Sequence, residues 1–135
     1  MRGGGALLDG EPLGAVRPKE EIEILAFEAT LTSLVAEHAA GVVGLAYRLR
    51  IMGSLALALC NLAAGRVDAV CSLKAARAVD IAAAQLLVRE CGFAIDGPDA
   101  PPFGRAPLDT SAHSRCVAAA TPALCARLYA ALAAG

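Results

Sequence analysis

Short apolar runs alternate along this chain with longer runs rich in Ala and Leu, and glycine or proline separates most of them. Residues 22–28 (Ile-Glu-Ile-Leu-Ala-Phe-Glu) alternate partly between apolar and charged side chains, which predicts a strand with one face in water. Further strands are expected at 45–51, 67–73, 93–95 and 115–119. Alternation of strands with helices is typical of an α/β domain.

Helices are expected between these strands, with glycine at several of their ends. Thr30 or Thr32 is expected to cap a helix that runs to about Ala40. Gly41 is expected to end that helix. The other expected helices are 55–64, followed by Gly65; 79–91, followed by Gly92; and one that starts at Thr121-Pro122 and includes Leu132. We therefore predict one α/β domain over residues 1–135, a layered sheet flanked by helices.

Composition excludes several classes of function. Lys and Arg number 12 against 13 Asp and Glu, so no basic field is available to bind nucleic acid. No uninterrupted apolar stretch reaches the roughly 18 residues that a membrane span needs. Residues 1–15 lack the pattern of a secretory signal, which makes the cytoplasm the expected compartment. The five cysteines include no Cys-x-x-Cys pair, and we expect reduced thiols in the core.

Three blocks of sequence carry a more specific signal. They are 3–13 (Gly-Gly-Gly-Ala-Leu-Leu-Asp-Gly-Glu-Pro-Leu), 53–69 (which begins Gly-Ser-Leu-Ala and ends Gly-Arg-Val-Asp-Ala) and 79–92 (which begins Val-Asp-Ile-Ala and ends Glu-Cys-Gly). The second block is similar to a Gly-Ser/Thr-Ala-Ala helix with Gly-x-x-Asp after it, and the third to a Trp-Asp-x-Ala helix with a Glu-Ala-Gly-Gly ending. In this order, the blocks resemble the carboxy-terminal half of the inositol monophosphatase family, to which fructose-1,6-bisphosphatase-like enzymes are related.

The resemblance implies a fold equivalent to the carboxy-terminal half of these sugar phosphatases. The family's metal-binding Glu and its Asp-Pro-x-Asp-Gly-Thr loop belong to an amino-terminal domain, and no such sequence occurs here. We therefore expect an incomplete enzyme, a natural truncation or one half of a split protein. It would need a separate amino-terminal half, and the resemblance also implies a homodimer partner.

In this family Mg²⁺ ions bind the phosphate and activate a water molecule, so the site needs clustered oxygen ligands. The resemblance assigns Asp80, in the third block, as a metal ligand and catalytic residue. The alternative is that Asp80 only complements the dipole of its own helix, as Asp in a first helical turn often does. A single carboxylate cannot complete a magnesium site, because Mg²⁺ takes six oxygen ligands.

The resemblance also implies substrate contacts at Gly53, Ser54 and Leu55, where a helix begins. A helix start attracts anions or hydroxyl groups. The alternative is an ordinary helix cap beside a glycine. Leu55 replaces a small Ala of the family pattern and could crowd a sugar ring.

Two cations follow in the next connection. Lys74 and Arg77 could bind a second phosphate group on a bisphosphate substrate, or simply lie in a solvated loop. Leu73 lies near the position of a Glu that contacts the sugar hydroxyls in inositol-specific members, which puts selectivity for myo-inositol in doubt. Asp68 is expected to fix a turn, and His38 and His113 have no partner at a catalytic spacing.

The resulting hypothesis is a Mg²⁺-dependent phosphomonoesterase that hydrolyses an inositol phosphate or a related sugar phosphate. The alternative is a non-catalytic binding or assembly module that keeps the scaffold. The 57% of hydrophobic residues supports this alternative, because loss of a packed domain would expose apolar surface and promote self-association. An unrelated nucleotide-binding domain is disfavoured, since the chain has neither Gly-x-Gly-x-x-Gly nor a Walker loop.

Overall fold

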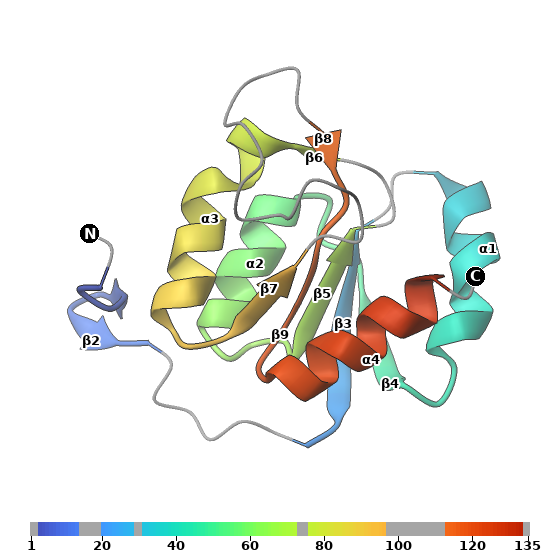
Figure 1. Ribbon diagram of the computed structural model, residues 1–135, viewed down its shortest axis with the longest axis horizontal. Helices are drawn as coiled ribbons and strands as arrows, with labels where there is room; N and C mark the ends of the chain where they lie inside the picture. Colours follow the sequence, from blue (N-terminus) through green and yellow to red (C-terminus); the bar gives the residue numbers. More distant parts are fainter. Residues whose placement is uncertain (1–2, 14–19, 29–30, 73–75, 97–112, 134–135) are drawn as a thin grey trace.

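A five-stranded sheet forms the centre of the computed structural model (Figure 1), which describes residues 3–13, 20–28, 31–72, 76–96 and 113–133. The strand order is β4-β3-β5-β9-β7. These strands are β3 (Ile22–Glu28), β4 (Ala46–Arg50), β5 (Ala69–Ser72), β7 (Ala94–Asp96) and β9 (Val117–Ala119). The helices are α1 (Thr32–Val42), α2 (Leu55–Ala63), α3 (Ala78–Glu90) and α4 (Pro122–Ala133). The predicted α/β fold, a layered sheet flanked by helices, is confirmed.

Strand direction determines where the helices begin. β3 runs parallel to both β4 and β5, and β9 runs antiparallel to both β5 and β7. The strands β3, β4, β5 and β7 therefore all end at one edge of the sheet, which we call the carboxyl edge. α1 follows β3, α2 follows β4, and α3 comes after β5 with the short strand β6 (Ala76–Arg77) between them, so all three helices begin at that edge (Figure 1).

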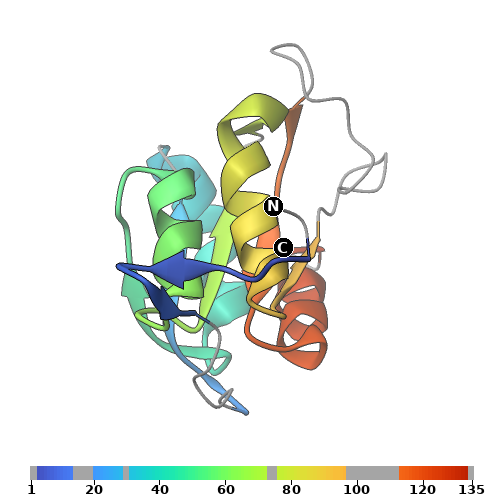
Figure 2. The same cartoon turned by 90° about the vertical axis from the view of Figure 1, so that its left-hand side faces the viewer.

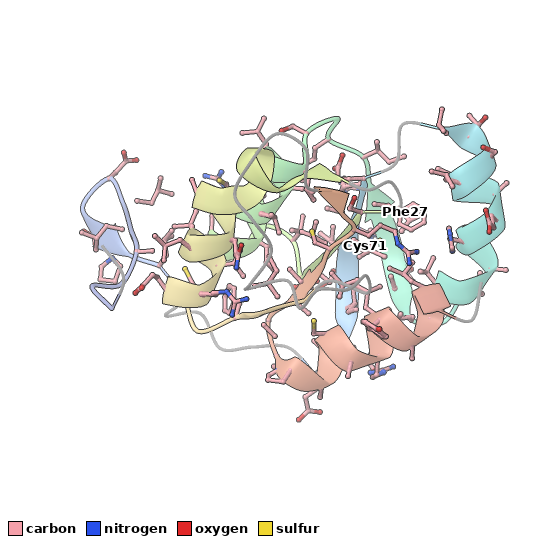
Figure 3. All side chains as sticks on the ribbon, turned by 45° about the horizontal axis from the view of Figure 1, so that its top comes forward. Phe27 and Cys71 are labelled. Carbon is pink, nitrogen blue, oxygen red and sulfur yellow. The ribbon has the colours of Figure 1, made fainter. Side chains whose placement is uncertain are left out.

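Helices cover both faces of the sheet. Successive residues of a strand point to opposite faces, so Leu25 and Phe27 face α1 and α4 while Ala26 faces α2 and α3. Phe27 of β3 lies opposite Cys71 of β5, and both side chains are fully buried in the cluster under α1 and α4 (Figure 3). The second cluster, which includes Leu59, lies under α2 and α3. The two apolar layers hold the helices against the sheet.

The prediction that strand 22–28 has one face in water is wrong. Glu23 is exposed, but the last four residues of the strand, from Leu25 to Glu28, are all buried. β3 pairs with a strand on each side and is covered by helices on both faces, so alternating polarity does not mark a wet face here.

The first helix also differs from its prediction, because α1 continues through Gly41 to Val42. A Cβ atom at Gly41 would lie 2.8 Å from the carbonyl oxygen of Ala131 in α4. Glycine at this position permits a close contact between two helices and does not end the helix. The left-handed backbone comes later, at Gly44, whose φ is +81°.

Most other helix ends agree with the sequence analysis. The hydroxyl of Thr121 accepts a hydrogen bond from the Leu124 N–H at 3.2 Å and caps α4. Gly65 and Gly92 have φ values of +77° and +76°, as expected for residues that follow a helix. At the start of α1, however, Leu31 holds the cap position and makes no side-chain cap. Thr30 lies outside the described residues, as does the predicted loop at 97–107.

Three small features complete the fold. A hairpin of β1 (Leu7–Leu8) and β2 (Glu11–Pro12) turns at Asp9-Gly10, and a second pair, β6 (Ala76–Arg77) with β8 (His113–Ser114), was not predicted. The Glu90 carboxylate accepts hydrogen bonds from the N–H groups of Gly3 and Gly5, the latter at 2.9 Å. These bonds hold the start of the hairpin against the end of α3, on the outer side of α2 and α3 (Figure 2). Among the described residues, no helix is both long enough and apolar enough to span a bilayer.

All five cysteines are free thiols, as expected. Cys60 is half-buried, and the buried ones are Cys71, Cys91, Cys116 and Cys125. Burial, reinforced by the neighbouring Cys125, raises the pKa of Cys116 to about 12. Burial also raises the pKa of Cys71 far above its ordinary range, with smaller contributions from Cys116 and Glu28. These thiols are protonated core residues and not nucleophiles.

Candidate functional site

The start of α2 lies at the carboxyl edge and contains three of the predicted substrate-binding residues. Ser54 caps the helix, because its hydroxyl accepts a hydrogen bond from the Leu57 N–H at 3.3 Å and its carbonyl accepts one from the Ala58 N–H at 3.0 Å. Gly53 precedes it with a φ of +79°, and among the described residues other than its chain neighbours, no atom lies within 4 Å of where its Cβ would be. Gly53 therefore presents an open backbone surface to the exterior.

Leu55, the third of these residues, is the first residue of α2 and is half-buried. Its side chain packs against the core cluster under α2 and α3. Part of the larger side chain is thus accommodated by the core, so the space above the helix start is less crowded than the sequence suggested.

A buried acidic residue that the sequence analysis did not single out holds this helix start. Glu28 is the last residue of β3 and is only 8% exposed. Its Oε1 accepts a hydrogen bond from the Met52 N–H at 2.9 Å, and its Oε2 accepts one from the Gly53 N–H at 3.1 Å. The available signal was its place directly after a buried apolar run, where strand ends meet at a ligand-binding edge.

Asp80, the predicted metal ligand, is the third residue of α3. α3 packs beside α2 on the same face of the sheet, and both helices begin at the carboxyl edge (Figures 1 and 2). The backbone position of Asp80 is therefore on the same edge as Gly53 and Ser54. Its side chain lies outside the described part of the structure, so its role as a ligand stays a prediction.

The other two predicted substrate residues precede α3. Lys74 and its neighbour Leu73 lie outside the described residues. Arg77 lies in β6, where its backbone pairs with that of His113 in β8. A contact of either cation with a second phosphate group stays a prediction.

The described residues do not form a complete magnesium site. Among them, no group of three or more His, Cys, Asp or Glu side chains is placed to hold a metal ion. Since Mg²⁺ requires about six oxygen ligands, further ligands would have to come from outside the described part of this chain.

Asp68 belongs to the opposite edge of the sheet. Its Oδ2 accepts hydrogen bonds from the backbone N–H groups of Glu23 at 3.0 Å and Ile24 at 2.8 Å, which ties the start of β5 to the start of β3. Asp68 therefore has a structural role, as expected, through partners in β3; that it also fixes the turn into its own strand stays a prediction. His38 is buried in α1, in the second turn of the helix and not at its start on the carboxyl edge.

Parallel strands followed by helices that all begin at one edge define an α/β domain of the kind that binds ligands at the carboxyl ends of its strands. The sequence adds the family, because residues 1–134 match the model of the inositol monophosphatase family. The chain belongs to this family.

Solved structures of similar fold include three bacterial and archaeal proteins. A Pyrococcus horikoshii protein, PH1897, described as having similarities to inositol-1 monophosphatase, aligns with a TM-score of 0.80 and 24% identity over 96% of this chain and 49% of its own. Mycobacterium tuberculosis SuhB aligns with a TM-score of 0.69 and 31% identity over 92% of this chain and 46% of its own. Thermotoga maritima IMPase TM1415 aligns with a TM-score of 0.75 and 20% identity over 98% of this chain and 49% of its own.

The chain thus spans about half the length of the solved structures that it matches. A comparison with curated proteins found no match.

Proposed function

We propose that this chain forms the substrate-side wall of a Mg²⁺-dependent phosphomonoesterase that acts on an inositol phosphate or a related sugar phosphate. The observation that carries the proposal is the shared edge. The start of α2, with Gly53 and Ser54, and the first turn of α3, with Asp80, lie on the same edge and the same face of the sheet. Membership of the inositol monophosphatase family supports this reading.

In this proposal Asp80 supplies one oxygen ligand to Mg²⁺, and a separate amino-terminal half supplies the others. The bound metal would polarise the phosphate and lower the pKa of an attacking water. Gly53, Ser54 and Leu55 contact the sugar, and Lys74 and Arg77 bind a second phosphate where the substrate carries one. Reduced, buried thiols fit a cytoplasmic location.

The test is Mg²⁺-dependent release of phosphate from inositol phosphate and from fructose bisphosphate. The chain is assayed alone and mixed with the amino-terminal half of a family member. We expect activity only in the mixture, and a loss of about 100-fold or more for Asp80→Asn, because a metal ligand supplies several kcal/mol of transition-state stabilisation. Asp68→Asn is the matched control at the other edge. An active mixture in which Asp80→Asn has no effect would remove Asp80 from the mechanism.

The second candidate is a non-catalytic assembly module. It is favoured by the apolar side chains exposed along the edge strand β4, where Tyr47 is 78% and Leu49 40% exposed. A mixture that forms a stable complex but releases no phosphate under any Mg²⁺ concentration would favour this candidate over the enzyme.

A further inference from the structure

The carboxylate of Glu28 spans two elements that are distant in the sequence. It leaves the end of β3 and reaches the connection between β4 and α2, where each of its two oxygens accepts one backbone hydrogen bond. The donors are consecutive, Met52 and then Gly53. Burial of a charged group is costly unless it is paired, so this side chain and these two N–H groups stabilise one another.

The same connection is held from its other side. The Asn61 side chain of α2 donates to the Met52 sulfur at 3.4 Å and to the Leu57 carbonyl at 2.9 Å. Met52 also packs against the core cluster under α2 and α3. The turn ahead of α2 is therefore fixed by a carboxylate, an amide and apolar packing at once, while no side chain of the described residues fills the space beside Gly53.

From these contacts we infer that Glu28 is a positioning residue for the substrate site at the start of α2, an inference that rests on the proposed function. Glu28 turns the N–H groups of Met52 and Gly53 inward, so these two groups are not donors to a ligand. Ser54 already satisfies the N–H groups of Leu57 and Ala58. The first-turn N–H groups of Leu55 and Ala56 have no intrahelical acceptor, and in the part of the chain that the structure describes no other acceptor is seen for them, so in this inference they meet the substrate.

The negative charge of Glu28 also acts on the choice of ligand. It lies beside the amino-terminal end of α2, where the helix dipole is positive, and it compensates part of that dipole. A second anion is less favoured there than a neutral hydroxyl group. The carboxylate thus biases this helix start toward the polyol part of a sugar phosphate.

Glu28→Gln is the variant that tests the inference, because a carboxamide keeps one oxygen acceptor and replaces the other with an NH₂ donor that cannot accept from a backbone N–H. Glu37→Gln, an exposed change in α1, is the matched control. In Glu28→Gln we expect hydrogen exchange at the Met52 and Gly53 amides to accelerate about tenfold or more, with exchange in β9 and α4 changed less than twofold.

In the active mixture with an amino-terminal half, Glu28→Gln is expected to raise KM about tenfold and change kcat less than twofold, as loss of uniform substrate binding does. A KM equal to that of Glu37→Gln, or acceleration of exchange spread equally over the whole chain, overturns the positioning role. Inactivity of the unmutated mixture would count against the proposed function instead. NMR titration with myo-inositol then decides. The inference requires the Leu55 and Ala56 amide signals of the unmutated chain to shift, and it requires myo-inositol to bind at least tenfold more weakly to Glu28→Gln.

Discussion

Gly41 in α1 faces the carbonyl oxygen of Ala131 in α4 so closely that a Cβ atom on the glycine would lie 2.8 Å from that oxygen. The two helices cover the same face of the sheet and enclose the core cluster that contains Phe27. Their spacing is therefore set by the absence of a side chain at one position.

The variant Gly41→Ala is expected to destabilise the fold. Alanine would gain about 1 kcal/mol of helix propensity, but the backbone contact would force α4 away at a cost of about 1–3 kcal/mol. Ala36→Gly, at an exposed position of the same helix, is the control and should lose about 1 kcal/mol through propensity alone. Urea unfolding monitored by circular dichroism measures both. A more stable Gly41→Ala protein would show that the helices can separate without cost.

Asp68 is expected to contribute to stability and not to catalysis. Asp68→Ala leaves the N–H groups of Glu23 and Ile24 without their carboxylate acceptor, which should lower the free energy of unfolding by about 1–3 kcal/mol. Glu37→Ala on the surface of α1 should change it by less than about 0.5 kcal/mol. Equal effects of the two substitutions in chemical denaturation would contradict the structural role.

The buried thiols predict a loss of stability in alkaline solution. The folded-state pKa of Cys116 is about 12, above its ordinary value of 9.0, so the unfolded chain releases this proton first as the pH rises. The stabilising contribution is complete below pH 9.0 and disappears as the pH rises through about 12. Between about pH 9.5 and 11, one such thiol should lower stability by roughly 1 kcal/mol per pH unit.

Cys116→Ala isolates this effect, because alanine does not titrate. Its stability should be lower than that of the unmutated chain near about pH 8 and should fall less steeply in alkali. Cys60→Ala, at the half-buried thiol, is the control. Identical slopes for Cys116→Ala and the unmutated chain would mean that the thiol is accessible to base in the folded state.

Exposed apolar side chains on β4 predict self-association of the isolated chain. Tyr47 of β4 and Ile51, the residue directly after that strand, are 78% and 59% exposed, and β4 lies at one edge of the sheet. The double variant Tyr47→Asp, Ile51→Asp should lower the average mass in sedimentation or light scattering at high concentration. Leu7→Asp, at another exposed residue in β1, should leave it unchanged. If the unmutated chain is monomeric in these measurements, β4 is not an association surface.

Local patterns in the sequence predicted much of the fold. Strand 22–28 was predicted at its observed bounds, and Gly65, Gly92 and Thr121 mark helix ends that the structure contains. Each of these signals depends on a few neighbouring residues. The blocks at 53–69 and 79–92 identified the family for the same reason, since their motifs are local in sequence.

Features that depend on distant residues were missed. The role of Gly41 depends on Ala131, ninety positions away, and the role of Glu28 depends on the path of residues 52 and 53. The antiparallel direction of β9 within an otherwise parallel sheet also depends on pairing partners and not on its own composition. Helical periodicity carries none of this information.

The bonds between Glu90 and the N–H groups of Gly3 and Gly5 have a consequence for divergence within the family. Both glycines have positive φ, near +80°, although no atom of the other described residues lies within 4 Å of the place where a side chain would begin. Backbone path, and not room, therefore restricts these positions to glycine. If position 90 loses its acidic side chain, the N–H groups at positions 3 and 5 lose their acceptor. Residues 3, 5 and 90 should therefore change together among homologues.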